Sequence, residues 1–186
     1  MSREKIKEVA VKHYIQFGYE GTKLSQIAEE VGIRKQSLAY HFQNKQTLFK
    51  EVFREALEEE VRFIQQYFKE NADKPVEQQL YQYLNEHKVR YRTNPNTRFT
   101  LEISFLVPDA LFADIDKELH IYMDRLTEVL ETCFSRKTFR KSGKECALAF
   151  LTVLDGLEVQ LVYEDSEKYD QVQNIIWDIF WTGIQK

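Results

Sequence analysis

The chain has few of the residues that break helices, and this scarcity limits the folds open to it. Among 186 residues there are only six glycines and three prolines. No stretch alternates apolar and polar residues between clusters of turn-forming residues, which is the usual pattern of half-buried β-strands. We therefore expect an all-α protein of long helices and short connections, with about nine helices in total.

Cysteine and histidine are also scarce, which argues against metal and disulfide sites. Cys133 and Cys146 stand apart without the spacing of a zinc site, and the four histidines are scattered along the chain. No nucleophile elbow, zinc-protease motif, phosphate loop or dinucleotide fingerprint occurs in the sequence. We expect no metal, no cofactor and no enzymatic activity.

Long apolar runs are missing as well. The first ten residues mix charged and apolar side chains, as the start of a helix does and a signal peptide does not. No apolar run approaches the length that crosses a membrane. These features predict a soluble, cytoplasmic protein that does not contact membranes.

The charge of the chain is unevenly distributed. The net charge is −4, but residues 1–57 carry 10 basic and 7 acidic residues, a balance of +3, which leaves −7 for residues 58–186. No acidic residue occurs from Gly32 to Phe49. A basic segment on an acidic body is typical of nucleic-acid binding at one end, although an excess of three charges is small.

Apolar residues spaced three and four apart predict a first helix that ends near Gly18 and Gly21. Thr22 is predicted to be the N-cap of a short second helix, which Gly32 ends. A third short helix is expected at residues 35–42.

The rest of the chain is predicted to form longer helices. Asn44 caps a long fourth helix, and Pro75 suits the first turn of a fifth. Asn94-Pro95-Asn96 is predicted to be a turn, and Pro108 interrupts the chain again. Between them, the dense apolar stretch at residues 99–107 is predicted to be buried. The last helices are expected at about residues 111–134, 143–164 and 168–185.

Residues 24–42 have the internal pattern of a helix-turn-helix. Ala28 is small where two helices would cross, and Gly32 can take the left-handed conformation that a tight turn needs. Apolar residues fix the crossing, and the residues between them on the second helix are predicted to face outward as donors to base edges and phosphates: Arg34, Lys35, Gln36, Ser37 and Tyr40. A basic surface hairpin that does not bind DNA would show the same pattern.

The same stretch matches a known signature. The matching positions are Phe17, Gly18 and Tyr19 at the end of the first helix, then Thr22, Ile27, Ala28, Gly32, Leu38, His41, Phe42, Lys45 and Leu48. In these residues the chain resembles the TetR/AcrR family of repressors. The resemblance is strong over residues 5–53 and only architectural beyond them.

The resemblance implies two domains, a three-helix helix-turn-helix domain at residues 1–46 and a larger helical ligand-binding and dimerisation domain at residues 47–186. It implies a repressor that binds a palindromic operator in double-stranded DNA as a homodimer and is released by a small-molecule effector. Because the fourth helix joins both domains, a ligand would tilt it and change the spacing of the two recognition helices. The same helix-turn-helix domain, residues 1–46 and called the head below, would also serve an activator, or a protein-binding adaptor without ligand response.

The resemblance also implies roles for single residues. Thr22 would contact a phosphate while capping the second helix, and Tyr40 and Lys45 would contact the DNA backbone. His41 and Phe42 would hold the hairpin together. The recognition-helix positions that approach bases and backbone are Arg34, Lys35, Gln36 and Ser37, and the amide of Gln36 could read adenine directly.

One departure from the family pattern lies beside these positions. The family usually has Tyr where this chain has Ala39. Tyr40 would take over that backbone contact one position along, but a shift of one residue rotates a side chain by about 100° around a helix. A contact made by Tyr40 would therefore come from a different side of the helix than in the family pattern.

The last two predicted helices have wide apolar faces. Trp177 and Trp181 lie four residues apart on a neighbouring face, where a lone monomer would leave them on the surface. We therefore expect the two helices to form a four-helix interface in a homodimer.

The aromatic residues of the larger domain favour an apolar or aromatic effector, although each one taken singly suits core packing better. Glu102 and Glu158 lie in apolar surroundings and would suit a cationic ligand, yet each is equally compatible with a solvated edge. No effector-binding residue is assigned. The candidates are Phe63, Tyr67, Tyr81, Tyr83, Tyr91, Phe99, Phe105, Phe112 and Tyr122.

Overall fold

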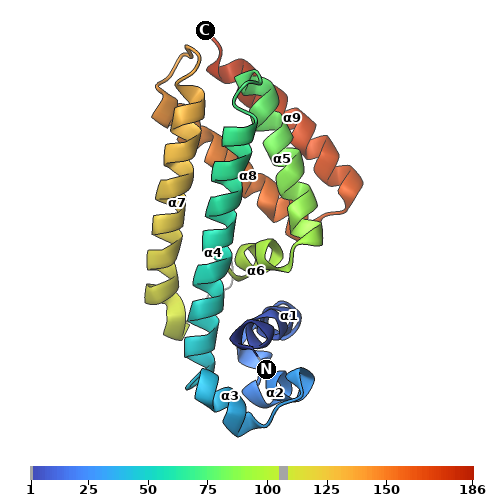
Figure 1. The fold of residues 1–186 in the computed structure, drawn as a ribbon. Coiled ribbons are helices and arrows are strands. Elements are labelled where there is room, and N and C mark those ends of the chain that lie inside the picture. Colours follow the sequence, from blue (N-terminus) through green and yellow to red (C-terminus); the bar gives the residue numbers. More distant parts are fainter. Residues whose placement is uncertain (1, 105–108) are drawn as a thin grey trace. The chain divides into compact units, whose positions relative to one another are not determined.

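The computed structural model of the chain describes residues 2–104 and 109–186 (Figure 1). These residues contain nine α-helices, one short 3-10 helix and no β-strand, which confirms the all-α prediction. Phe105, Leu106 and Val107 of the predicted apolar stretch, and the predicted interruption at Pro108, lie outside the described residues. The helices are α1 Arg3–Gly21, α2 Leu24–Val31, α3 Lys35–His41, α4 Lys45–Glu70, α5 Val76–Thr93, α6 Pro95–Ser104, the 3-10 helix Asp109–Leu111, α7 Phe112–Phe134, α8 Gly143–Tyr163 and α9 Ser166–Ile184.

The chain packs into two compact units, each built from two stretches of sequence. Unit 1 comprises Met1–Glu60 and Thr93–His120, and unit 2 comprises Val61–Arg92 and Ile121–Lys186. Helices α4 and α7 each contribute residues to both units. The domain boundary expected after residue 46 divides the chain by function, whereas the two units divide it by packing. The expected boundary therefore stays a prediction.

Aromatic side chains hold unit 1 together where α1 packs against α6. Tyr14 on α1 is 1% exposed, and its ring centroid lies 4.9 Å from that of Phe49 on α4 and 5.8 Å from that of Phe99 on α6. Phe99 also lies 6.0 Å from Phe53. Rings in such contact bury large apolar areas, so these three helices share one core.

The segment Asn94-Pro95-Asn96 begins a helix, and the prediction of a simple turn is wrong. Pro95 is the first residue of α6, a position where its missing N–H costs nothing. Asn94 Oδ1 accepts hydrogen bonds from the backbone N–H groups of Asn96 and Thr97, at 2.8 and 3.3 Å. The Thr97 hydroxyl donates to the buried Glu60 of α4 at 2.6 Å. The Asn94 cap and the Thr97–Glu60 hydrogen bond together outweigh the preference of asparagine and proline for turns.

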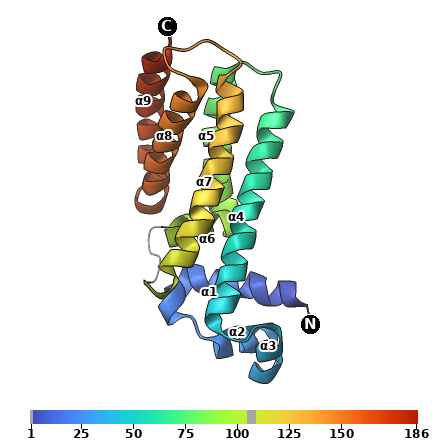
Figure 2. The ribbon, with the colours of Figure 1, turned by 90° about the vertical axis from the view of Figure 1, so that its left-hand side faces the viewer.

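Unit 2 is built around α8 and α9, which lie side by side (Figure 2). Phe150 of α8 is completely buried, with its ring 6.3 Å from Tyr83 of α5, 6.3 Å from Phe134 of α7 and 5.9 Å from Phe180 of α9. This aromatic centre joins four helices in one core.

The two tryptophans of α9 are half-buried within unit 2, so the prediction that a lone monomer would strand them on the surface is wrong. Trp177 lies 5.3 Å from Tyr81 on α5 and 5.5 Å from Trp181, centroid to centroid. Trp181 in turn lies 5.7 Å from Phe139. The sequence did not reveal that α5 and the connector after α7 would cover this face.

Helix α8 is long and apolar enough to cross a membrane by length and composition, contrary to the expectation that no apolar run comes close. Its buried residues belong to the core of unit 2 and are Cys146, Ala147, Phe150, Leu151, Leu154, Leu157 and Leu161. The central helix of a soluble protein meets the same two criteria, so the length alone carries little weight.

Candidate nucleic-acid interface

Helices α2 and α3 form the predicted helix-turn-helix within unit 1. Gly32 ends α2 with φ 77° and ψ 32°, the left-handed conformation that favours glycine. Its N–H donates to the carbonyl of Glu29 at 3.0 Å, and the N–H of Ile33 donates to that of Ala28 at 2.9 Å. Ala28 and Leu38 are 2% and 0% exposed, so a small and a large side chain fix the crossing as predicted.

The outward face of α3 carries five side chains with hydrogen-bonding groups. The backbone carbonyl of Arg34 accepts from the N–H groups of Ser37 and Leu38 and so starts the helix. Within residues 2–104 and 109–186, none of the five side chains makes a hydrogen bond or an ion pair, and Tyr40 is 90% exposed. Five of the predicted DNA-binding residues are therefore exposed to solvent on α3 and at its N-cap, namely Arg34, Lys35, Gln36, Ser37 and Tyr40.

Thr22 does not cap α2, so that prediction is wrong. The N-cap residue is Lys23, whose N–H donates to Gln26 Oε1 at 3.2 Å. Thr22 is 1% exposed, and its hydroxyl lies 3.0 Å from the carbonyl oxygen of His13 and 2.7 Å from that of Gly18. Two carbonyls of α1 hold the hydroxyl inside the unit, so a phosphate contact would require it to leave both.

Lys45, the other predicted phosphate contact outside α3, also makes contacts inside unit 1. Its ammonium donates to the backbone carbonyl of Tyr19 at 2.7 Å and lies 4.2 Å from the centre of the Tyr19 ring. The same group lies 4.0 Å from the carboxylate of Glu20. Carbonyl groups at the end of a helix attract a cation, which explains why the side chain turns toward the end of α1. As predicted, Asn44 caps α4, since its Oδ1 accepts from the N–H of Thr47 at 2.8 Å.

The N-terminus of α1 ties the hairpin to α4. The Arg3 guanidinium lies 4.2 Å from the ring centre of the buried Phe42 and donates to the carbonyl of His41 at 2.8 Å. Arg3 also forms an ion pair with Glu51 of α4. The hydrogen bond from Arg3 holds the pKa of Glu51 below its usual range, and Glu51 raises the pKa of Arg3.

Lys23, which was not among the predicted DNA contacts, is an exposed cation at the N-cap of α2. Ser25 and Gln26, in the first turn of the same helix, are exposed as well. The N–H groups that lack helical partners in this turn would attract an anion. The sequence does show a basic residue directly after Thr22. Its role was missed because Thr22 was predicted to be the N-cap in its place.

Among the described residues, no group of three or more His, Cys, Asp or Glu side chains is placed to hold a metal ion. Burial raises the pKa of the Cys133 thiol to about 11, even though the nearby Arg136 acts to lower it. A thiol of that pKa is protonated and a poor nucleophile at neutral pH.

Comparison with known proteins gives independent information on the head. Residues 6–52 match the family model described as bacterial regulatory proteins, tetR family. The chain is 39% identical over 56 residues to the HTH-type transcriptional regulator RutR of Escherichia coli strain K12, a match that covers 30% of this chain and 26% of RutR. It is 39% identical over 49 residues to IcaR of Staphylococcus aureus strain Newman, a negative transcriptional regulator of the biofilm operon icaADBC, and this match covers 26% of each protein.

A solved structure extends the similarity over the whole chain. The transcriptional regulator FadR of Bacillus subtilis, in complex with stearoyl-CoA, is 19% identical with a TM-score of 0.72, and the match covers 99% of this chain and 100% of FadR. Similarity at this identity shows the fold. The helix-turn-helix head followed by a larger helical domain, predicted from the sequence, is therefore confirmed.

Proposed function

We propose that this chain is a ligand-responsive transcriptional repressor of the TetR/AcrR family, acting in the cytoplasm and binding a palindromic operator as a homodimer. The observation that carries the proposal is the outward face of α3, where adjacent donor side chains are exposed and make no polar contact within the described residues. Exposed side chains without polar contacts inside the protein lose only hydrogen bonds to water when they bind base edges and phosphates. The negative regulation named for IcaR supports repression rather than activation.

The DNA contacts that we propose fall into two groups. Gln36 would read a base edge, since a glutamine amide can form a bidentate pair with adenine. The other four exposed side chains of α3 contact phosphates and bases around it. Thr22 and Lys45, which the resemblance implied as phosphate contacts, would reach DNA only by giving up their hydrogen bonds to backbone carbonyls, and we propose that both keep those bonds.

The proposed homodimer forms through α8 and α9. Exposed apolar side chains lie on both helices, with Leu148, Ile175 and Ile179 at 50%, 55% and 61% exposure. A groove of about 380 Å³ runs between them, and a Cβ added at Gly156 in this groove would meet no atom within 4 Å. A second copy would cover these residues and pack closely along the glycine. Two heads joined in this way suit two half-sites one helical turn apart.

The proposed effector is apolar or aromatic. Unit 2 contains a pocket of about 310 Å³ whose apolar lining includes Phe68, Ala72, Val129 and Cys133. The stearoyl-CoA bound to FadR supports a partly apolar ligand for a protein of this fold. Since α4 contributes residues to both units, a ligand that prefers one packing of unit 2 would change the recognition helices through it, with a coupling of about 1–3 kcal/mol.

Selection of random DNA duplexes on the purified chain tests this proposal. We expect enrichment of a palindromic site whose half-sites are about one helical turn apart. Enrichment of an asymmetric single site would contradict the dimeric repressor. No enrichment at low salt, with the dimer intact, would favour a protein-binding adaptor. In a reporter assay on the selected site, higher expression in the presence of the chain would show an activator.

A further inference from the structure

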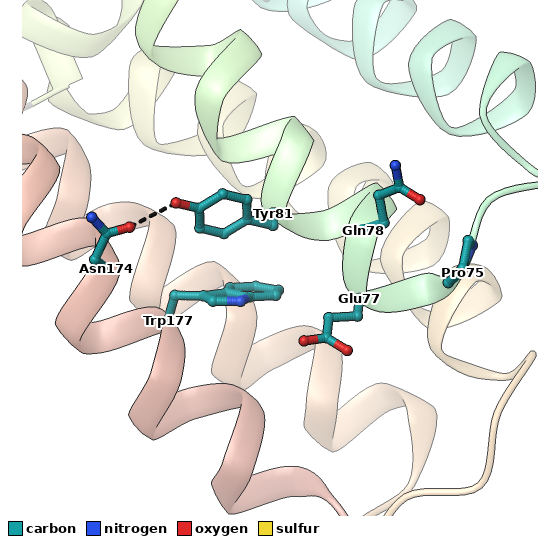
Figure 3. A pocket seen from close by; sticks show the side chains of 6 residues that line it. All are labelled: Pro75, Glu77, Gln78, Tyr81, Asn174 and Trp177. Carbon is teal, nitrogen blue, oxygen red and sulfur yellow. Dashed lines mark hydrogen bonds between the residues drawn. The ribbon is translucent and has the colours of Figure 1, made fainter.

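A second pocket of unit 2 lies between α5 and α9 and has a volume of about 450 Å³. Figure 3 shows the side chains that line it, with the Tyr81 and Trp177 rings facing the same opening and the Glu77 carboxylate beside the indole. The lining is completed by Pro75, Gln78 and Asn174. This pocket shares no lining residue with the proposed dimer groove or the proposed effector pocket.

The aromatic walls of this pocket are held in place before any ligand binds. The Tyr81 hydroxyl donates to Asn174 Oδ1 at 2.7 Å, which fixes the direction of its ring. The Trp177 ring lies 5.3 Å from Tyr81 at an interplanar angle of 58° and stacks on Trp181 at 5.5 Å and 11°. Walls that are already ordered reduce the entropy lost on binding.

The charge of the pocket selects the sign of its ligand. Glu77 is the single charged residue in the lining, and its exposed carboxylate makes no ion pair or hydrogen bond within residues 2–104 and 109–186. The faces of tryptophan and tyrosine rings are electron-rich and attract cations, most strongly for tryptophan. Carboxylate and ring faces therefore favour a cation and disfavour an anion in the same space.

The pocket stays accessible in the proposed dimer. Trp177 is two residues from Ile175 and from Ile179, and residues two apart on a helix point about 160° away from each other. The two isoleucines are exposed on the proposed dimer face. Trp177 therefore points away from that face, and dimerisation leaves the opening uncovered.

We propose that the pocket between α5 and α9 binds a small organic cation, whose ammonium centre rests against the Trp177 and Tyr81 rings and pairs with the Glu77 carboxylate. Its volume accommodates an ammonium group carrying several carbon substituents. The proposal goes beyond DNA binding and does not depend on it, since the site is complete in one copy of unit 2.

The chain contains its own reporter for this site, because Trp177 and Trp181 are its only two tryptophans. We would titrate the full chain with choline, and in parallel with 3,3-dimethylbutan-1-ol, which has the same shape without the positive charge. The expected result is a saturable change in tryptophan emission with choline and none at equal concentrations of the alcohol. Equal responses to both compounds, or no saturable response to choline, would overturn the proposal.

Two glutamine substitutions locate the binding. Glu77→Gln keeps both tryptophans and should weaken choline binding roughly fivefold, the factor expected for loss of a modest electrostatic contact. Glu167→Gln is the matched control, since Glu167 is an exposed glutamate in the first turn of α9 as Glu77 is in that of α5. Equal affinities of the two variants would place the cation elsewhere and overturn the proposal.

A third variant tests the ring contact by calorimetry, which needs no fluorescence. Trp177→Leu keeps an apolar side chain but removes the electron-rich ring, and choline binding should fall at least fivefold. Thermal unfolding of this variant checks that unit 2 stays folded, and unchanged choline affinity in the folded variant would contradict the site. All titrations are made without DNA, so their outcome is independent of operator binding.

Discussion

The ammonium of Lys45 lies 2.7 Å from the carbonyl oxygen of Tyr19 and 4.2 Å from the centre of the same residue's ring. One side chain at the start of α4 thus binds the end of α1 in two ways. A lysine at this position would attract a phosphate in an isolated helix, because helix N-termini favour anions. In the folded head, its first role is to hold α1 and α4 together.

Substitution Lys45→Met should therefore destabilise the head. It removes a charged hydrogen bond and a cation–π contact while keeping a long apolar side chain, and we expect a loss of about 1 kcal/mol. Urea unfolding followed by circular dichroism measures it. The slope of log affinity for DNA against log salt concentration should change little, because the ammonium is engaged inside the protein.

Lys35→Met provides the matched comparison, since Lys35 is exposed at the start of α3. This variant should unfold at the same urea concentration as the parent chain and should reduce the magnitude of the salt slope by about 1, the amount expected for one phosphate contact. If the two lysine variants showed the reverse pattern, Lys45 would be the phosphate contact and the account of the head would be wrong.

Thr22→Val should destabilise the chain by about 1–2 kcal/mol. Valine has nearly the same shape, but it has no hydroxyl to donate to the carbonyls of His13 and Gly18. These carbonyls would then lose a hydrogen-bond donor in a part of the head that water does not easily reach. Chemical denaturation provides the measurement. Thr182→Val, at an exposed position of α9, is the control and should change stability by less than about 0.5 kcal/mol. A neutral Thr22→Val would show that the hydroxyl points elsewhere.

The Arg3–Glu51 ion pair should make the head sensitive to acid. The pKa of Glu51 is lowered in the folded chain, so its contribution is fully present above the ordinary carboxyl pKa of 4.5 and is lost as the pH falls through the lower folded value. Because Arg3 is partly exposed, we expect Glu51→Gln to cost no more than about 1 kcal/mol at pH 7.

Thermal unfolding at pH 7 and at about pH 3 tests this dependence. The difference between the parent chain and Glu51→Gln should shrink toward zero at the lower pH. Glu29→Gln, an exposed substitution on α2, should leave the unfolding temperature unchanged at both. A Glu51→Gln effect that persists undiminished in acid would mean that the ion pair contributes nothing.

The proposed dimer should separate when charge is placed on its apolar face. Ile179→Glu puts a carboxylate at a residue that is 61% exposed in one copy, so the monomer should still fold. In the dimer the charge would be buried without a partner, which costs several kcal/mol. Sedimentation equilibrium should find the parent chain dimeric and the variant monomeric at the same concentration. Asp178→Asn, next along α9, should remain dimeric, and a dimeric Ile179→Glu would place the interface elsewhere.

Local sequence predicted the parts of the structure that local physics determines. The tight turn after α2 needs a left-handed residue, which Gly32 supplies. Asn44, one residue before α4, has a side-chain oxygen that can cap that helix. The outward positions of α3 followed from the spacing of its apolar neighbours. In each case the decisive interaction lies within a few residues of the chain.

The predictions that failed depended on contacts between distant segments. Thr22 turns toward carbonyls of α1, and Trp177 packs against Tyr81, which lies far away in the sequence. Asn94 was predicted in a turn because asparagine and proline favour turns, but the Thr97 hydrogen bond to Glu60 fixes the helix that follows. Such a side chain can take several partners, and tertiary packing decides which one it takes.

The most direct test of the central claim compares the parent chain with Gln36→Ala on a set of duplexes, each changed at one base pair of the selected operator. Gln171→Ala, at an exposed position of α9, is the control. We predict that Gln36→Ala loses discrimination of about 1–3 kcal/mol at one position of each half-site and keeps it elsewhere. If Gln36→Ala discriminated at every position as the parent chain does, the outward face of α3 would not be reading DNA at this residue, and the proposed interface would be contradicted.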